Sequence, residues 1–107
     1  MDAIPAVTVD QVPQPLPDGL TVLDVREPVE WQQAHVPGSV HIPLGELPSR
    51  LEELPSDQQL LVVCAVGARS ARAVRYLVER GHDAVNLAGG LMEWQEAGRE
   101  VGGGVTG

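Results

Sequence analysis

Residues 60–81 read LLVVCAVGARSARAVRYLVERG, and this stretch carries the strongest structural signal of the chain. It begins with a continuous apolar run at residues 60–63, which is typical of a strand buried on both faces of a parallel sheet. Cys64 follows at the carboxyl end of that strand, where ligands bind in open α/β sheets. Apolar residues at helical spacing then predict an amphipathic helix over residues 70–81, with Ser70 as its N-cap.

The same alternation of strand and helix extends over most of the chain. Short apolar or β-branched runs predict five strands, at residues 6–9, 21–25, 39–42, 60–63 and 84–87. Helical patterns lie between them, at residues 28–34, 47–54, 70–81 and 90–97. This order predicts an α/β sandwich around a largely parallel sheet. We expect one domain over residues 1–101 and a flexible glycine-rich tail over residues 102–107.

The composition is that of a small globular domain with one hydrophobic core. The 107 residues are 43% hydrophobic and 21% charged, which excludes the disordered, collagen-like and coiled-coil classes. With 15 acidic residues against 7 basic ones, the net charge of −8 argues against binding to nucleic acid or to an anionic membrane. The single cysteine excludes an internal disulfide, and no stretch has the ~20 apolar residues of a membrane span. We therefore expect a cytoplasmic protein.

Several features around Cys64 favour its thiolate form. Gly67 allows the loop to curl so that its backbone N–H groups converge on an anion. The helix that follows begins with Arg69 and Arg72 and carries no carboxylate before Glu79, which predicts a local positive charge on an acidic protein. We therefore interpret Cys64 as a nucleophile with a lowered pKa. The alternative is an inert cysteine that ends a buried strand.

The spacing between Cys64 and Arg69 bears on the substrate. Arg69 stands five positions after the cysteine. Cysteine phosphatases have their arginine six positions after it, in a longer loop that surrounds a tetrahedral oxyanion, so the spacing disfavours phosphatase or arsenate chemistry. The smaller loop suits a terminal sulfur atom carried on the cysteine, with loop N–H groups stabilising an anionic persulfide.

Four blocks of sequence, in this order and at these distances, resemble the rhodanese-like (thiosulfate sulfurtransferase) family. They are LDVREPVEW at 23–31, AHVPGSVHIPL at 34–44, VCAVGARSA at 63–71 and LAGGLMEW at 87–94. The resemblance implies a three-layer sandwich, with a mainly parallel five-stranded sheet and helices on both faces. It also implies a six-residue active loop that begins with the nucleophile, which maps onto Cys64, Ala65, Val66, Gly67, Ala68 and Arg69.

The resemblance extends to supporting residues. Arg69 is the expected cation facing the substrate, and Asp24 and Arg26 match an Asp-x-Arg motif that helps to frame the active site. These two residues form either a structural ion pair at a strand end or a direct substrate contact. Ser70 and Arg72, at the start of the helix, are the other candidate supporting residues.

The activity implied by the resemblance is transfer of sulfane sulfur. Cys64 takes the outer sulfur of thiosulfate or of a donor persulfide and passes it to cyanide or a thiol, without a metal or organic cofactor. Because Ala65, Val66 and Ala68 are small or apolar, we expect free thiosulfate to bind weakly. A protein of a sulfur relay is a further candidate partner. The alternative function is that of a regulatory or protein-binding module with little thiosulfate activity.

The histidines are interpreted as structural. His35, His41 and His82 lack the spacing of a zinc site, and we expect His35 and His41 to tie loops together. On the helix after Cys64, Arg75 and Glu79 are four positions apart and predict a surface ion pair.

The remaining acidic and aromatic candidates are also given structural interpretations. Glu27 and Glu30 lie at a helix start, where the helix dipole favours acids, so we interpret them as solvated rather than catalytic. Trp31 and Trp94 are expected to pack against the sheet.

Overall fold

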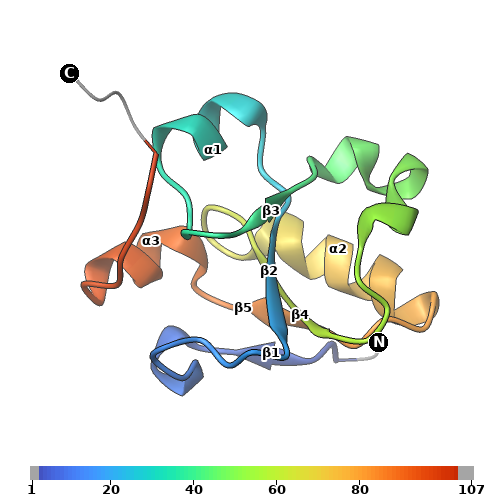
Figure 1. Ribbon diagram of the computed structural model, residues 1–107, viewed down its shortest axis with the longest axis horizontal. Helices are drawn as coiled ribbons and strands as arrows, with labels where there is room; N and C mark the ends of the chain where they lie inside the picture. The colour runs from blue at the N-terminus through green and yellow to red at the C-terminus, as the bar shows by residue number, and fades with distance from the viewer. Residues whose placement is uncertain (1–2, 104–107) are drawn as a thin grey trace.

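The computed structural model describes residues 3–103 and contains a five-stranded sheet in the order β1-β5-β4-β2-β3 (Figure 1). The strands are β1 (Ala6–Val7), β2 (Leu20–Asp24), β3 (Val40–His41), β4 (Gln59–Val63) and β5 (Ala84–Leu87). Every neighbouring pair is parallel. The helices are α1 (Pro28–Gln33), α2 (Ala68–Glu79) and α3 (Gly90–Glu96), with 3-10 helices η1 (Val9–Gln11), η2 (Leu44–Ser49) and η3 (Leu51–Glu53). This confirms the predicted α/β class and the parallel sheet.

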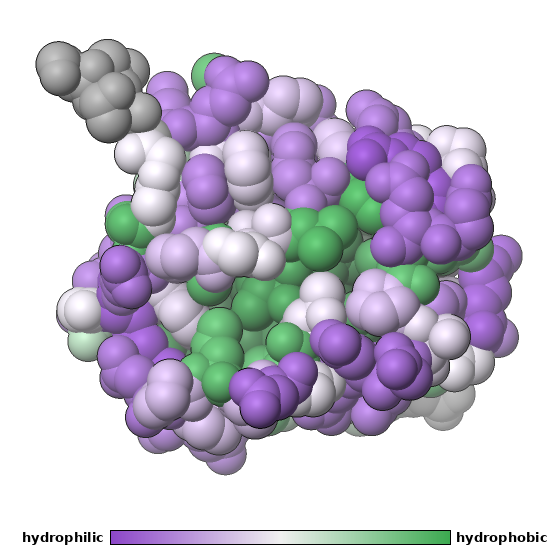
Figure 2. Space-filling view, in the orientation of Figure 1, coloured by the Kyte–Doolittle hydropathy of each residue, from purple (hydrophilic) through white to green (hydrophobic). Residues whose placement is uncertain are grey.

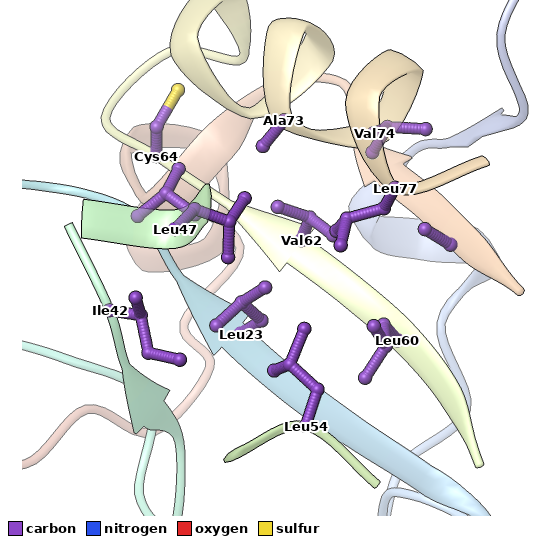
Figure 3. Close-up of a cluster of buried hydrophobic side chains, with 12 residues drawn as sticks. Leu23, Ile42, Leu47, Leu54, Leu60, Val62, Cys64, Ala73, Val74 and Leu77 are labelled. Atoms are coloured by element: carbon purple, nitrogen blue, oxygen red, sulfur yellow. The ribbon is translucent and has the colours of Figure 1, made fainter. Parts of the chain in front are cut away.

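Alternate residues of β4 pack into two separate clusters, one on each face of the sheet. Leu60 and Val62 are buried with Leu77 of α2, in the cluster drawn in Figure 3, which η2 and η3 help to close. Leu61 is buried on the opposite face with Trp94 of α3. In Figure 1, α2 and α3 accordingly lie on opposite sides of the strands. Burial on both faces explains why β4 is a continuous apolar run rather than an alternating one.

The helix predicted over residues 47–54 is wrong, because this segment forms two short 3-10 helices instead. Its backbone bonds link residues three apart, as in Arg50 N–H to the Leu47 carbonyl at 3.1 Å and Leu54 N–H to the Leu51 carbonyl at 3.0 Å. Pro48 lies inside η2 and has no N–H to give to a longer helical ladder. The segment still buries Leu47 and so covers its face of the sheet.

Trp94 packs on the sheet as predicted, whereas Trp31 reaches the sheet only at its edge strand β3. Its ring stacks on His35, with centroids 3.7 Å apart, and on His41 at 5.2 Å. The indole N–H donates to the Ser39 hydroxyl at 3.1 Å. Trp31 therefore joins α1 to β3 and to the segment that leads into it.

The surface combines hydrophilic side chains with a hydrophobic hollow. On the face in Figure 2, hydrophobic surface fills the depressed middle of the molecule and hydrophilic side chains surround it. No helix within residues 3–103 combines the length and apolarity needed to cross a membrane. At the end of the chain, Gly102 pairs with His35 in an antiparallel bridge, so this first residue of the predicted tail is tied to α1's end. Residues 104–107 lie outside the described residues.

Candidate active site

Cys64 directly follows β4, at the edge where the parallel strands end. Its side chain is 1% exposed and belongs to the cluster of Figure 3, but its sulfur points out of the aliphatic side chains toward the start of α2. The loop from Cys64 to Gly67 leads into that helix (Figure 1). The predicted position of Cys64, between a buried strand and a helix start, is therefore confirmed.

The helix α2 begins two residues earlier than predicted, which changes the role of Ser70. Its N-cap is Gly67, whose φ of +103° is accessible to glycine and rarely to other residues. A Cβ at Gly67 would also lie 2.3 Å from the Ala88 carbonyl oxygen. Ser70 is thus not the cap but a residue of the first helical turn, where backbone N–H groups have no partner within the helix. Its N–H and hydroxyl are both available to the cysteine.

The sulfur of Cys64 accepts hydrogen bonds from the loop and from this first turn. The Gly67 N–H lies 3.1 Å from Sγ and the Ser70 hydroxyl 3.3 Å from it. Burial raises the pKa of the Cys64 thiol, but bonds from the Ser70 hydroxyl and from the N–H groups of Ser70, Gly67 and Val66 outweigh it. The pKa therefore lies below its ordinary value, as predicted. Hydrogen bonds are the main causes that lower it, and the coulombic interaction with Arg69 is a smaller one.

A buried asparagine on β5 completes this network, and it was not among the predicted residues. Asn86 Oδ1 lies 2.5 Å from the Ser70 hydroxyl oxygen and shares its single proton with Cys64 Sγ, and the Asn86 amide donates to the Gly67 carbonyl at 3.3 Å. It thereby holds Gly67 and Ser70, two of the residues that donate to Sγ. Its one sequence signal was an amide in a strand that is otherwise apolar, since buried polar groups require partners.

The beginning of α3 fixes the other side of the loop. The Leu91 N–H donates to the Cys64 carbonyl at 2.8 Å, and the Met92 N–H donates to the Ala65 carbonyl at 3.0 Å. This close approach requires glycine at position 90, where φ is +63° and a Cβ would lie 2.4 Å from the Ala65 oxygen. The loop carbonyls are thus turned toward α3, which leaves the N–H groups of the loop facing the sulfur.

Arg69, the expected substrate-facing cation, is held by a carboxylate of α1. Its Nη1 and Nη2 donate to the two carboxylate oxygens of Glu30 at 2.7 and 2.9 Å. The Glu27 N–H also donates to Glu30, at 2.9 Å. The hydrogen bond from Arg69 is the largest cause that lowers the pKa of Glu30 to about 2. Glu30 is therefore an ion-pair partner of the loop, and its interpretation as a merely solvated residue is wrong.

Asp24 and Arg26 form a buried ion pair at the end of β2. The Arg26 Nη2 lies 2.8 Å from Asp24 Oδ2, and the Arg26 backbone N–H donates to Oδ1 at 3.0 Å. Nη2 also donates to the Ala34 carbonyl at 2.6 Å. Both side chains are nearly inaccessible. This geometry matches the structural interpretation of the motif, since most of the guanidinium donors are used within the protein.

Arg26 also borders a hollow that opens over the active loop. This loop hollow has a volume of about 510 Å³ and is lined by Arg26, Ala65, Val66, Leu91, Met92, Gln95 and Glu96. Val66 and Met92 are 55% and 51% exposed, so the mouth is mainly apolar. Arg72 lies elsewhere, in a separate hollow beside η2 that includes Leu44 and Tyr76. A contribution of Arg72 to the charge around the thiol stays a prediction.

The His35 and His41 rings both bond backbone carbonyls, and the His41 ring links two separate segments as predicted, whereas the His35 ring bonds within the end of α1. His35 Nδ1 lies 2.6 Å from the Trp31 carbonyl, and His41 Nε2 lies 2.8 Å from the Arg26 carbonyl. Within residues 3–103, no cluster of His, Cys, Asp and Glu has the geometry to hold a metal ion. On α2 the predicted pair of Arg75 and Glu79 does not form, because Glu79 is placed 3.8 Å from Arg80 instead.

A rhodanese-like domain model matches residues 8–97. The chain is 36% identical over 85 residues to a sulfurtransferase of Allochromatium vinosum. The matched region covers 78% of this chain and 79% of that protein. The chain is 37% identical over 95 residues to YrkF of Bacillus subtilis, a protein that bears the name of a sulfur carrier, and spans about half (51%) of its length. The crystal structure of a rhodanese-related protein from Thermoplasma volcanium matches with a TM-score of 0.86 and 35% identity, over 92% of this chain and 97% of that one. The chain belongs to the rhodanese-like domain family.

Proposed function

We propose that this protein is a sulfurtransferase that carries sulfane sulfur as a persulfide on Cys64. The observation that carries the proposal is the environment of Sγ, which receives the Gly67 N–H at 3.1 Å and the Ser70 hydroxyl at 3.3 Å. An anionic sulfur is stabilised by such preorganised donors. The relatives named for sulfur transfer and sulfur carriage support the same chemistry at the level of the family.

The proposed reaction has two steps that share one covalent intermediate. The Cys64 thiolate attacks the outer sulfur of thiosulfate or of a persulfide, a new S–S bond forms, and the donor's own bond breaks. The electron pair of that bond leaves with sulfite or with a thiolate. A nucleophilic acceptor, such as cyanide or a thiol, then attacks the outer sulfur and returns Cys64 to its thiolate. No oxidant, metal or organic cofactor enters this balance.

Each residue of the loop has a proposed part in these steps. Cys64 is the nucleophile, while Ala65, Val66, Gly67 and Ala68 form the backbone that surrounds the transferred sulfur, and Arg69 closes the loop through its ion pair with Glu30. Ser70 stabilises the thiolate, and Asp24 with Arg26 holds the neighbouring strand end. A free thiol as the chain's single cysteine fits a reducing compartment such as the cytoplasm.

Steady-state kinetics with cyanide as acceptor tests this proposal. A covalent sulfur intermediate predicts parallel lines in double-reciprocal plots when donor and acceptor are varied together. The Cys64→Ser variant should form no thiocyanate with thiosulfate, with an organic thiosulfonate or with a small persulfide. If folded wild-type protein is inactive with all three donors, the proposal fails and a protein-binding role for this domain is favoured.

A further inference from the structure

The two arginines of the candidate site are both neutralised by carboxylates. Arg26 is buried against Asp24, and Arg69 makes a two-point contact with Glu30 at the surface, where the two side chains are 34% and 30% exposed. The hydrogen bond that Arg69 donates to Glu30 is the largest cause that raises the pKa of Arg69, and the Cys64 thiolate is a smaller one. Arg69 is therefore within electrostatic reach of the sulfur, but its charge is already compensated.

The surface over the loop is otherwise apolar or acidic. The loop hollow is lined by the side chains of Val66, Leu91 and Met92, with the amide of Gln95 and the carboxylate of Glu96 as its other polar groups besides Arg26. Its volume of about 510 Å³ is in the range of sites for small organic molecules. On a protein of net charge −8, a dianion approaching this hollow meets repulsion without a free cation to offset it.

We propose that Glu30 is a positioning residue for donor specificity: by holding Arg69 it disfavours thiosulfate and favours a small organic donor with at most one negative charge at its sulfane sulfur. The inference rests on the proposed sulfurtransferase function and names the donor class for that reaction. The organic group of the donor occupies the loop hollow, beside Val66 and Met92. Its sulfane sulfur then lies over Cys64.

Benzenethiosulfonate is a suitable probe, because it differs from thiosulfate by one negative charge and one apolar group. The Cys64 thiolate attacks its sulfane sulfur, and the new S–S bond forms as the bond to the sulfonyl sulfur breaks. The electron pair leaves with benzenesulfinate, and Cys64 remains as the persulfide anion. With thiosulfate the same step releases sulfite and brings one more negative charge to the loop.

The test compares Glu30→Gln with Glu53→Gln, using cyanide as the acceptor for both donors. Glu53 is a matched control, because it makes a two-point contact with Arg50 at 2.9 Å for each bond, on a part of the surface formed by η2 and η3. We expect Glu30→Gln to raise the ratio of kcat/KM for thiosulfate over benzenethiosulfonate about fivefold, as expected for an exposed ion pair. The change should come from a lower KM for thiosulfate. Glu53→Gln should leave the ratio unchanged.

Further variants separate Arg69 from a general structural effect. Glu30→Gln combined with Arg69→Gln should lose the gain, because the cation that Glu30 restrains is then missing. Glu30→Asp retains the charge on a shorter side chain and should raise the ratio of kcat/KM values by less than Glu30→Gln does. This variant provides a second test if Glu30→Gln is too unstable to assay. The inference is overturned if folded Glu30→Gln and Glu30→Asp leave the ratio of the two kcat/KM values unchanged. It is also overturned if the double variant shows the same rise as Glu30→Gln. Absence of transfer from either donor in the wild type refutes the proposed function instead.

Discussion

At Cys64 two opposing effects act on the ionisation of the thiol. Burial of the side chain disfavours the thiolate, while the Ser70 hydroxyl and the N–H groups of Ser70, Gly67 and Val66 stabilise it. The second effect is larger, so the thiol pKa is lowered. These donors belong to the loop and to the first turn of α2, which means that the loop and the helix start, and not a histidine base, favour the thiolate.

Removing the Ser70 hydroxyl should therefore raise the pKa of the Cys64 thiol. In Ser70→Ala we expect the thiolate fraction at pH 7 to fall by up to about tenfold, the loss of a hydrogen bond to a charged group. The thiolate absorbance in the ultraviolet measures this directly, because the chain has one cysteine. Ser49→Ala is the matched control, since the Ser49 hydroxyl bonds only the Glu46 carbonyl on the surface. A pKa equal to that of wild type in Ser70→Ala would contradict this role of Ser70.

Some residues of the site could be predicted from the sequence, and others could not. Cys64 and Gly67 are identified by local order, because a cysteine between a buried strand and a glycine-bearing loop is typical of a nucleophile held at a helix start. Glu30 and Asn86 act through contacts with residues 39 and 16 positions away in the sequence. Such pairs depend on how α1, α2 and β5 come together, which no single segment encodes.

At the level of elements, α3 acts as a support for the loop that follows Cys64. Two N–H groups at its start bind the carbonyls of Cys64 and Ala65, and Gly90 permits this approach. The loop is thus held from both sides, by α3 on its carbonyl face and by α2 through the sulfur. This arrangement keeps the N–H donors in place before a substrate arrives.

A side chain at position 90 should disturb this support. Gly90→Ala combines a positive φ of +63° with a Cβ 2.4 Å from the Ala65 oxygen, and we expect a loss of about 1–3 kcal/mol in the free energy of unfolding. Denaturation in urea measures this loss. Gly45→Ala is the control, because a Cβ there meets nothing within 4 Å, and it should cause no loss. Equal stability of the Gly90→Ala and wild-type proteins would refute the close approach.

The elements themselves were predicted best where packing and local pattern agree. The strand at residues 60–63 was confirmed within one residue, as β4 begins at Gln59. The segment 47–54 was predicted incorrectly because its apolar spacing is helical, while Pro48 limits the backbone to 3-10 turns. The predicted start of α2 is two residues late, because serine is a favoured residue type at the N-cap. In the structure Gly67 occupies the N-cap position instead.

At the scale of the whole molecule, the ion pair between Glu30 and Arg69 joins α1 to α2 across the site. The pKa of Glu30 is lowered from 4.5 to about 2 in the folded state. A carboxyl whose pKa is lowered by folding adds stability above its unfolded pKa, and this contribution is lost as the pH falls toward the folded value. The pair therefore stabilises the protein at neutral pH and ceases to do so in acid.

This linkage predicts a difference between wild type and Glu30→Gln in acid. As the pH falls from 4.5 toward about 2, the wild type should lose more of its free energy of unfolding than the variant does. Urea denaturation at a series of pH values measures the two curves. Glu52→Gln, which removes an exposed carboxylate of η3, should follow the wild type. Parallel curves for wild type and Glu30→Gln would show that the ion pair contributes nothing to folding.

The fold class of the whole molecule could be predicted from the sequence, because strand and helix patterns alternate and their boundaries are well marked. The order of strands and the two covered faces follow the class that this alternation predicts. The distribution of charge around Cys64 was harder to predict from the sequence. An acidic chain with two arginines near a cysteine predicted a positive site, but folding brings Glu30 to Arg69 and sends Arg72 toward η2.

The most direct test of the central claim is the intact mass of the protein after incubation with a sulfane-sulfur donor. With benzenethiosulfonate, and separately with thiosulfate, the wild type should gain the mass of one sulfur atom and lose it again on addition of cyanide. Cys64→Ser should gain nothing, and because Cys64 is the single cysteine, the gain is assigned without ambiguity. Folded wild-type protein that gains no sulfur from either donor, or a Cys64→Ser variant that gains as much, would contradict a persulfide carried on Cys64.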